Sequence, residues 1–209
     1  MRVLIACEHS GVIRDKVIEA GHICTSCDLK PGEGLHTSSH YQGDVMNIIG
    51  WNWDLMIAHP VCRYLANSGV SWLHKDASRW PELFKAAEFF KKLWNADIPK
   101  ICIENPIPHK YALQLIGELY TQTIQPYNFG DDASKRTCLW LKGLPKLKNT
   151  IYYEPKIIKY KGKPVKRWGN QAPFGTDKTS SGGNRAEIRS RTYEGIAKAI
   201  VDQWVINKF

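Results

Sequence analysis

The chain lacks any uninterrupted hydrophobic run that approaches the ~20 residues of a membrane-spanning helix. Its first apolar residues are soon followed by Glu8 and His9, which predicts an opening strand and not a secretory signal. Cysteines number six in 209 residues, and Cys7, Cys102 and Cys138 lie inside apolar segments, unlike the cysteines of a disulfide scaffold. We therefore expect a reduced, cytoplasmic protein with one main core and no membrane partner; its oligomeric state stays open.

One group of cysteines and histidines has a metal-like spacing. Cys24 and Cys27 are followed by His36 and His40. The gap between the second cysteine and the first histidine is shorter than in zinc fingers, and the two cysteines would point to opposite faces of a strand. We therefore predict no metal, and interpret the group as two small strand residues followed by loop histidines.

Acidic residues are scarce between Lys142 and Arg167, where nine basic residues meet only Glu154. This segment has a formal charge of +8, against +9 for the whole chain. Tyrosines and Trp168 are interleaved with its lysines, and lysines contact phosphates while aromatic rings stack on bases. The pattern predicts a nucleic-acid surface; a solvated hairpin without a partner is the alternative. The expected binding residues are Lys159, Lys161, Lys163, Lys166 and Arg167.

Short apolar runs alternate with amphipathic stretches as far as Trp140, and no internal repeat is present. This alternation predicts an α/β fold with a doubly wound, mostly parallel sheet. The predicted strands are Arg2–Cys7, His22–Cys27, Val45–Ile49, Trp53–Ala58, Lys100–Ile103, Thr121–Gln125 and Thr137–Leu141. The predicted helices are Ser10–Ala20, Trp80–Trp94, Tyr111–Ile116 and a closing helix, Thr192–Ile206.

Two predicted strands end in residues that can do chemistry. The strand before His59 and Pro60 is followed by Cys62 on a polar loop, and the strand at Lys100–Ile103 ends at Glu104. Because the carboxyl ends of parallel strands meet at one edge of a sheet, we expect the thiol and the carboxylate to face one crevice. The alternative is that Cys62 is a small buried hydrophobe.

The first strand ends in the turn Cys7-Glu8-His9-Ser10-Gly11, which opens directly onto a helix. Such a turn brings backbone amides against a nucleotide-like ligand. Asp28 follows the second strand, about 20 residues on, where an acid typically accepts hydrogen bonds from ribose hydroxyls. A third acid, Asp44, opens the next predicted strand. With a single glycine and no dinucleotide fingerprint, an ordinary connection would look similar.

Taken in order, these pieces resemble the cytosine-5 DNA methyltransferase family, in particular its small, phage-type members. The family's Pro-Pro-Cys loop matches Pro60-Val61-Cys62, and its Glu-Asn-Val strand end matches Glu104-Asn105-Pro106. Its later arginine motif matches Ser134-Lys135-Arg136. The resemblance covers the chain from its start to about Trp140, and the closing helix.

The resemblance implies a Rossmann-like methyltransferase sheet that holds S-adenosylmethionine at its carboxyl edge. The methyltransferase-like domain would comprise residues 1–143 and 185–209, with 144–184 as a short basic insertion or reduced target-recognition segment. The residues implied in cofactor binding are Cys7, Glu8, His9, Ser10, Gly11, Asp28, Leu29, Asp44, Val45 and Pro60.

The implied reaction is methyl transfer to carbon 5 of cytosine in DNA. Cys62 would attack ring carbon 6, Glu104 would act on ring nitrogen 3, and Arg136 would hold the base carbonyl. A base inside a duplex would have to be flipped or supplied single-stranded.

Three features depart from the family pattern. Val61 replaces the proline before the nucleophile, Cys138 replaces a second arginine, and the segment 144–184 is short where typical members carry a full target-recognition domain. Several substrates therefore stay open: duplex or single-stranded DNA, RNA, or a free pyrimidine nucleotide. A non-catalytic relative that binds nucleotide or DNA is a further alternative.

Overall fold

The computed structural model describes residues 1–178 and 191–207, and no helix in these residues is long and apolar enough to span a membrane. The chain divides into two compact units. The sheet unit comprises Met1–Thr123 and Thr137–Lys146, and the hairpin unit comprises Ile124–Arg136 and Leu147–Phe209. This grouping differs from the predicted domain division, which stays a prediction. Residues 179–190, which that division splits between its two parts, lie outside the described residues.

A seven-stranded sheet has the order β3-β2-β1-β4-β5-β7-β6. β1 to β5 pair in parallel and β7 pairs antiparallel with β5, so the predicted doubly wound, mostly parallel, Rossmann-like sheet is confirmed. The order reverses between β1 and β4, and ligands of open α/β sheets bind at such a switch point. The strands are β1 (Arg2–Ala6), β2 (Ile23–Asp28), β3 (His40–Gln42), β4 (Leu55–Ala58), β5 (Lys100–Pro106), β6 (Gln122–Ile124) and β7 (Thr137–Lys142).

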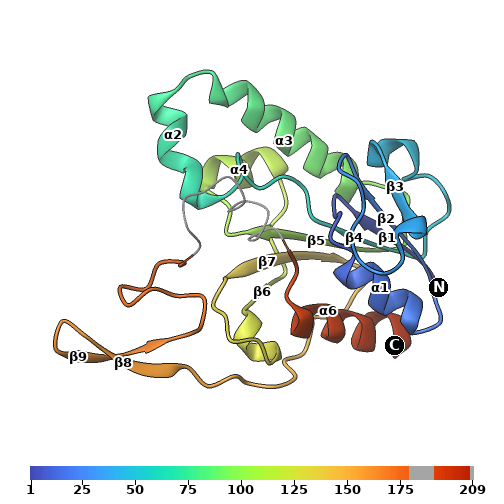
Figure 1. Ribbon diagram of the computed structural model, residues 1–209. Coiled ribbons are helices and arrows are strands. Elements are labelled where there is room, and N and C mark those ends of the chain that lie inside the picture. Colours follow the sequence, from blue (N-terminus) through green and yellow to red (C-terminus); the bar gives the residue numbers. More distant parts are fainter. Residues whose placement is uncertain (179–190, 208–209) are drawn as a thin grey trace. The chain divides into compact units, whose positions relative to one another are not determined.

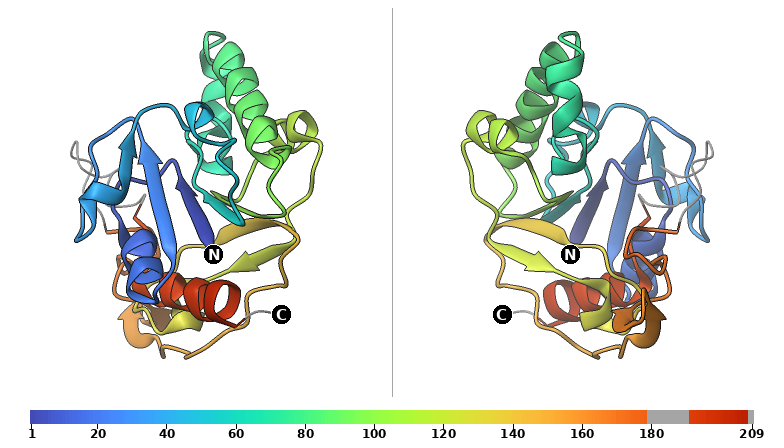
Figure 2. Two further views of the ribbon diagram at one scale, coloured as in Figure 1. Left: turned by 90° about the vertical axis from the view of Figure 1, so that its right-hand side faces the viewer. Right: turned by 90° about the vertical axis from the view of Figure 1, so that its left-hand side faces the viewer.

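Helices cover both faces of the sheet, as the double winding requires. α1 lies on one face, and α3 and α4 lie on the other (Figures 1 and 2). Alternate strand residues such as Leu4, Met56 and Ile103 pack in one core with Phe90 of α3 and Ala112 of α4. The helices of the sheet unit are α1 (Val12–Glu19), α2 (Val70–Lys75), α3 (Arg79–Trp94) and α4 (Lys110–Ile116), with 3-10 turns at Thr37–Ser39, Val45–Asn47 and Asn67–Gly69.

Two predictions about elements of the sheet unit are wrong, and one element was missed. Val45–Ile49 is no strand, because the Asp44 side chain accepts the backbone N–H of Met46 and starts a 3-10 turn there. The third strand is instead His40–Gln42, in a segment predicted as loop, so Asp44 follows β3 and does not open a strand. The helix α2 was not predicted at all.

The hairpin unit contains the 3-10 turn Pro126–Phe129, the antiparallel pair β8 (Lys156–Tyr160) and β9 (Lys163–Arg167), and α6 (Glu194–Ile200) (Figure 1). The two-residue turn between β8 and β9 has φ 49° at Lys161 and φ 79° at Gly162, and two positive φ values suit the twist of a hairpin. The predicted basic hairpin is therefore shorter than Lys142–Arg167. The closing helix begins at Glu194, two residues later than predicted, and ends in a π-helical segment, Val201–Ile206.

Candidate active site

The first part of the site lies where β4 ends beside β5, which runs on to Pro106. The parallel register pairs Ala58 with Ile103, so His59, the residue after β4, is next to Glu104 of β5. His59 Nδ1 lies 3.2 Å from Glu104 Oε2. Its other ring nitrogen, Nε2, is buried and has no hydrogen-bond partner among the described residues. The candidate acid is thus held by a histidine on the strand that leads to the thiol.

The loop that carries Cys62 is clamped by the segment that follows β5. Asn105 is 1% exposed, and its Nδ2 donates to Pro60 O at 3.2 Å. Further along, the backbone N–H of Asn67 donates to Ile107 O at 2.8 Å. Both ends of the thiol loop are therefore tied to the chain segment that begins at Glu104.

His109 completes this clamp. Its Nε2 lies 2.8 Å from Tyr64 O, and its Nδ1 accepts the backbone N–H of Ala112 at 3.0 Å, which caps α4. Burial lowers the pKa of His109, against the opposing effect of the Tyr64 carbonyl. The neutral ring is the form that can donate with one nitrogen and accept with the other.

Among the six cysteines, all within the described residues, Cys62 is the exposed one. Burial raises the pKa of Cys24 and Cys102, and raises that of Cys27 to about 11. Since the thiolate is the nucleophile, these buried thiols are inert. The alternative of a buried Cys62 is excluded by its exposure.

The second part of the site is the turn after β1. Glu8 is 6% exposed, and its Oε1 accepts the Ser10 hydroxyl and the backbone N–H of Gly11. The backbone N–H of Glu8 donates to Cys27 O at 3.0 Å. The turn thus uses amides of Glu8 and Gly11 within the chain, where the sequence predicted amides facing a ligand. Oε2 of Glu8 is buried without a partner among the described residues.

Asp28 and Asp44 lie near the same turn, the one after β1. Each uses one carboxylate oxygen to accept a local backbone N–H, from Lys30 and from Met46, at 2.9 Å. Burial raises the pKa of the Cys7 thiol, and the nearby charges of Asp28 and Asp44 raise it further. The three predicted strand-end positions therefore converge on one place.

A buried polar network holds the chain segment after β2 against α1. Arg14 is fully buried; it pairs with Asp15 at 2.8 Å and donates to Ser26 Oγ at 2.9 Å and to Glu33 O. A Cβ at Gly11, which has φ 77°, would clash with Arg14 and with Glu33 O. Gly11 is thus required by this packing.

Asp15 anchors the other end of that segment. It accepts the backbone N–H groups of Leu35 and His36 at 2.7 and 3.2 Å. Burial alone would raise the pKa of Asp15, but these bonds and the Arg14 guanidinium hold it below its usual range. The carboxylate is therefore charged and is needed by its neighbours.

The remaining predicted site residues lie as follows. His9 is buried, Leu29 is 75% exposed, and Val45 and Pro60 are buried. Arg136 is exposed and belongs to the hairpin unit, directly before Thr137, which pairs with Pro106 in the β5–β7 register. The structure brings together Cys62's loop with Glu104, and Glu8 with Asp28 and Asp44.

The predicted nucleic-acid residues lie on β8, on β9 and in the turn between them, where Lys159, Lys161, Lys163 and Lys166 are exposed. Arg167 is half-buried, and its Nε donates to Pro173 O at 3.0 Å. The Trp168 ring stacks on Tyr127 at 4.3 Å between centroids, so one of its faces is already covered.

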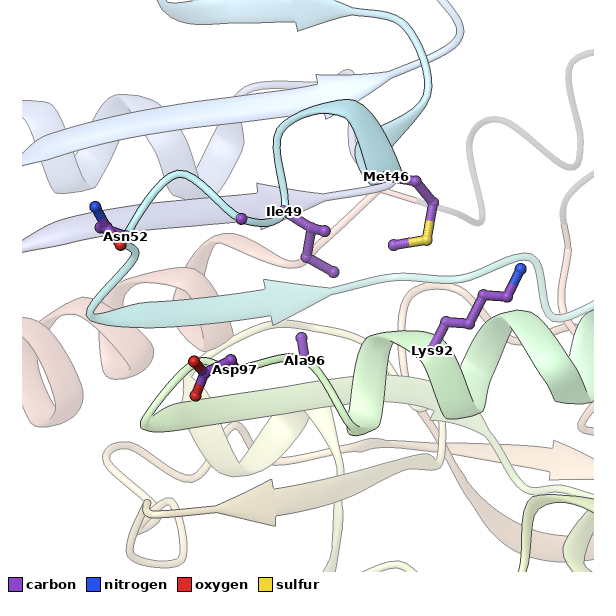
Figure 3. A pocket seen from close by; sticks show the side chains of 7 residues that line it. Met46, Ile49, Asn52, Lys92, Ala96 and Asp97 are labelled. Carbon is purple, nitrogen blue, oxygen red and sulfur yellow. The ribbon is translucent and has the colours of Figure 1, made fainter.

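A pocket of about 180 Å³ lies beside β4 in the sheet unit. Met46 and Lys92 lie at one end, and Asn52 and Asp97 at the other (Figure 3). None of the predicted site residues lines it.

His40 of the metal-like group holds neighbouring segments together. His40 Nδ1 lies 2.8 Å from Ser26 Oγ and its Nε2 lies 2.9 Å from Lys30 O. In the described residues, no cluster of three or more His, Cys, Asp or Glu side chains could hold a metal ion.

Sequence reasoning missed His59, His109 and Arg14. His59 precedes the Pro-Val-Cys loop directly, and His109 stands just before a predicted helix, which is a capping signal. Arg14 gave no signal, because its partners come from three separate segments of the chain.

No protein-family model matches the sequence, and neither does any curated protein. A prophage-encoded protein of Escherichia coli, assigned as a DNA modification methyltransferase, is 13% identical at a TM-score of 0.47, over 97% of this chain and 69% of its own. The methyltransferase EhMeth of Entamoeba histolytica is 16% identical at 0.44, over 74% and 58%. An rRNA methylase of Escherichia coli is 16% identical at 0.42, over 68% and 56%. At these low similarities, the function proposed below is drawn from the chain's own residues.

Proposed function

We propose that the chain is an S-adenosylmethionine-dependent methyltransferase that acts on carbon 5 of cytosine in nucleic acid, with Cys62 as the nucleophile. The observation that supports this most is the arrangement at the ends of β4 and β5. The exposed thiol lies on a loop tied to the strand of Glu104 by the contacts His59–Glu104 and Asn105–Pro60, both of 3.2 Å. An accessible thiol, and a carboxyl group fixed on the strand to which the thiol's loop is tied, are what addition to a pyrimidine ring needs.

The carboxylates at the ends of β1 to β3 fit the proposed cofactor. Glu8 Oε2 is buried and unpartnered among the described residues, so a cationic donor such as an amino group would satisfy it. Asp28 and Asp44 each have a second carboxylate oxygen that can accept from ribose or adenine. When bound, the cofactor supplies an electrophilic methyl group on its sulfonium.

The side chains would then act in sequence. The thiolate of Cys62 adds to ring carbon 6, which makes carbon 5 an enamine-like nucleophile. The carboxyl group of Glu104 protonates or hydrogen-bonds ring nitrogen 3 and so takes up the charge that this addition creates. Carbon 5 would then take the methyl group as the carbon–sulfur bond of the sulfonium breaks and leaves a neutral thioether. A base would remove the carbon 5 proton, elimination would release the thiolate of Cys62, and the proton at ring nitrogen 3 would return to Glu104. Arg136 would hold the base carbonyl.

The basic hairpin supports nucleic acid as the substrate. Its exposed lysines lie on a two-stranded ribbon whose strands are joined by one tight turn. Lysines at such positions neutralise phosphates without reading sequence. A small segment of this kind would hold DNA or RNA without a full recognition domain.

The decisive experiment is transfer of labelled methyl from S-adenosylmethionine to duplex DNA, single-stranded DNA, RNA and dCMP in parallel. We expect label at carbon 5 of cytosine in a polynucleotide with the wild type, and none with Cys62→Ala. Label in dCMP alone would make the protein an enzyme of free pyrimidine nucleotides. Tight cofactor binding without any transfer would make it a binding protein.

A second experiment tests the hairpin. Nucleic-acid affinity should fall with salt at a log–log slope of roughly −3 to −5, for about three to five phosphate contacts. Replacing Lys159, Lys161 and Lys163 by Gln should flatten that slope by about 2 to 3. Replacing Lys85, Lys91 and Lys92 on α3 removes the same formal charge and should leave the slope unchanged. A salt-independent interaction in the wild type would remove the hairpin from the proposal.

A further inference from the structure

A second group of cations and aromatic rings begins at the thiol loop itself, in the sheet unit. Arg63 and Tyr64 directly follow Cys62. The guanidinium groups of Arg63 and Arg79 lie 5.7 and 4.9 Å from the centre of the Tyr64 ring. Nε of Arg79 is buried and has no hydrogen-bond partner among the described residues. The start of α3 is thereby brought to the loop of the nucleophile.

The helix α2 adds an exposed ring to this group. Trp72 is 55% exposed, and Lys75 Nζ lies 5.2 Å from its ring centre. On the same helix Leu73 is 2% exposed, so α2 packs through Leu73 and presents Trp72 to solvent. An indole left exposed beside an ammonium group is not needed for the core.

The rings beneath tie α2, α3 and α4 together. Trp80 contacts Tyr111 at 5.2 Å and His74 at 6.3 Å between ring centres, and Tyr111 contacts His74 at 5.7 Å. Lys110 Nζ lies 4.9 Å from the Tyr111 ring. Figure 1 shows these three helices together at one end of the sheet unit. Trp80 and Tyr111 are half-buried and pack against the core, so they form the base of the surface.

The net charge of this surface is positive. Residues 61–81 and 107–117 contain four lysines and arginines and a single acid, Asp76. Asp76 already accepts the backbone N–H and the hydroxyl of Ser78, at 3.0 and 2.6 Å. Cations interleaved with aromatic rings are the composition that binds single strands, through phosphate contacts and base stacking.

We propose that Arg63, Tyr64, Trp72, Lys75, Arg79 and Lys110 form a binding surface for the unpaired nucleotides that flank the reacting base. A base stacks on Trp72, and the cations hold the adjoining phosphates. This inference rests on the proposed function, because it takes nucleic acid as the substrate. The surface would give the chain a preference for single-stranded or locally opened substrate. Its residues belong to the sheet unit, whereas the lysines of the basic hairpin belong to the hairpin unit.

The test is equilibrium binding of the full chain to a short labelled single strand and to a duplex of the same length, without cofactor, over a series of salt concentrations. Trp72→Ala should weaken binding of the single strand about tenfold, which corresponds to the loss of one stacked base. Binding of the duplex should change less, and the salt slope should stay the same. Trp72→Phe should restore most of the affinity, because a smaller ring still stacks.

Trp51 provides the matched control for the ring. It is 49% exposed and stacks on Trp53. It lies before the amino end of β4, whereas the proposed surface begins after the carboxyl end of that strand. Trp51→Ala should leave binding unchanged. Replacing Arg63, Lys75 and Lys110 by Gln should instead flatten the single-strand salt slope by about 2, at ~0.7 per phosphate, whereas Lys92→Gln should have no effect.

Two outcomes overturn the proposal: unchanged single-strand affinity in Trp72→Ala, or an equal loss in Trp51→Ala. Its failure is distinguishable from failure of the proposed function. Binding through Trp72 without any methyl transfer would retain the surface and reject the reaction. Methyl transfer by Trp72→Ala with unchanged KM for a single strand would retain the reaction and reject the surface.

Discussion

At the end of β1 the polar groups are enclosed, whereas at the end of β4 the chain is open. Glu8 and Ser10 are 6% exposed and bond to each other, and the segment after β2 is pinned over them by Arg14. Val61, in contrast, is 64% exposed and the neighbouring Cys62 is exposed too. Both turns lie at the switch point of the same sheet.

This difference in exposure fits what each region would have to bind: the cofactor at the end of β1, and the base at the end of β4. A small cofactor is held by carboxylates fixed in advance, because preorganised groups lose little freedom on binding. A base attached to a polymer needs an approach from solvent, which an exposed loop provides. The thiol loop is open at Cys62 but clamped at both ends, by Asn105 and by Ile107. Exposure without loss of position is the property that a nucleophile for a large substrate requires.

The largest effect is expected from replacing Cys62, the proposed nucleophile in the open loop after β4. DNA that carries 5-fluorocytosine should form a stable covalent adduct with the wild type, because fluorine blocks the final elimination. Cys62→Ser should form none, since a hydroxyl without a base to activate it is a weak nucleophile. The adduct is measured by denaturing gel and mass spectrometry. Cys24→Ala, which removes a buried thiol of β2, should still form it; an adduct that persists in Cys62→Ser would contradict the mechanism.

The next largest effect is expected from a substitution that destabilises the enclosed region at the end of β1. Asp15→Asn removes the charge that pairs with the fully buried Arg14 guanidinium, and an uncompensated buried charge costs about 3–5 kcal/mol in the free energy of unfolding. The pKa of Asp15 is lowered in the folded state, so its contribution is present above the unfolded pKa, about 3.9, and is lost as the pH falls through the folded pKa.

Urea denaturation of both proteins at neutral and acidic pH measures this. The difference between wild type and Asp15→Asn should be constant at neutral pH and shrink in acid. Asp97→Asn, an exposed aspartate at the opposite edge of the sheet, should change the stability by no more than about 0.5 kcal/mol. Equal stability of wild type and Asp15→Asn would mean that Arg14 finds another partner.

Much of this comparison could be predicted from sequence, and the reason is periodicity. The apolar strands before Cys62 and Glu104 fix the sheet, and parallel pairing then brings their ends together. The enclosure could not be predicted. It depends on Arg14, whose partners Ser26 and Glu33 are distant in sequence, and buried arginines give no local pattern.

The missed third strand has a different cause. A short apolar run after Asp44 is compatible with a strand or a turn. The turn forms because the Asp44 side chain accepts a hydrogen bond from the backbone N–H of Met46. The strand His40–Gln42 is only three residues long and has no apolar alternation to reveal it. Asp44 was expected to open the third strand, whereas in the structure it follows β3.

A smaller effect sharpens the role of the enclosed half. Asp28→Ala and Asp44→Ala should each weaken binding of S-adenosylmethionine by about ten- to hundredfold, the equivalent of roughly 1.5–3 kcal/mol for a charge-assisted hydrogen bond. Isothermal calorimetry measures this, with Asp97→Ala as the control. Unchanged affinity in both variants would put the cofactor pocket elsewhere.

The smallest effect concerns the clamp on the open half. His109→Ala removes the cap of α4 and the contact with Tyr64 O, which should lower the free energy of unfolding by about 1–2 kcal/mol. His109→Asn can still cap the helix but is too short to reach Tyr64, so it should recover about half of that loss. Burial lowers the pKa of His109, so this stabilisation is present above the unfolded pKa, about 6.5, and is lost as the pH falls through the lower folded pKa. Stability measured against pH should therefore separate wild type from His109→Ala at pH 8 and bring them together in acid, while His36→Ala follows the wild type throughout. A wild type and His109→Ala of equal stability at pH 8 would show that the thiol loop keeps its place without the clamp.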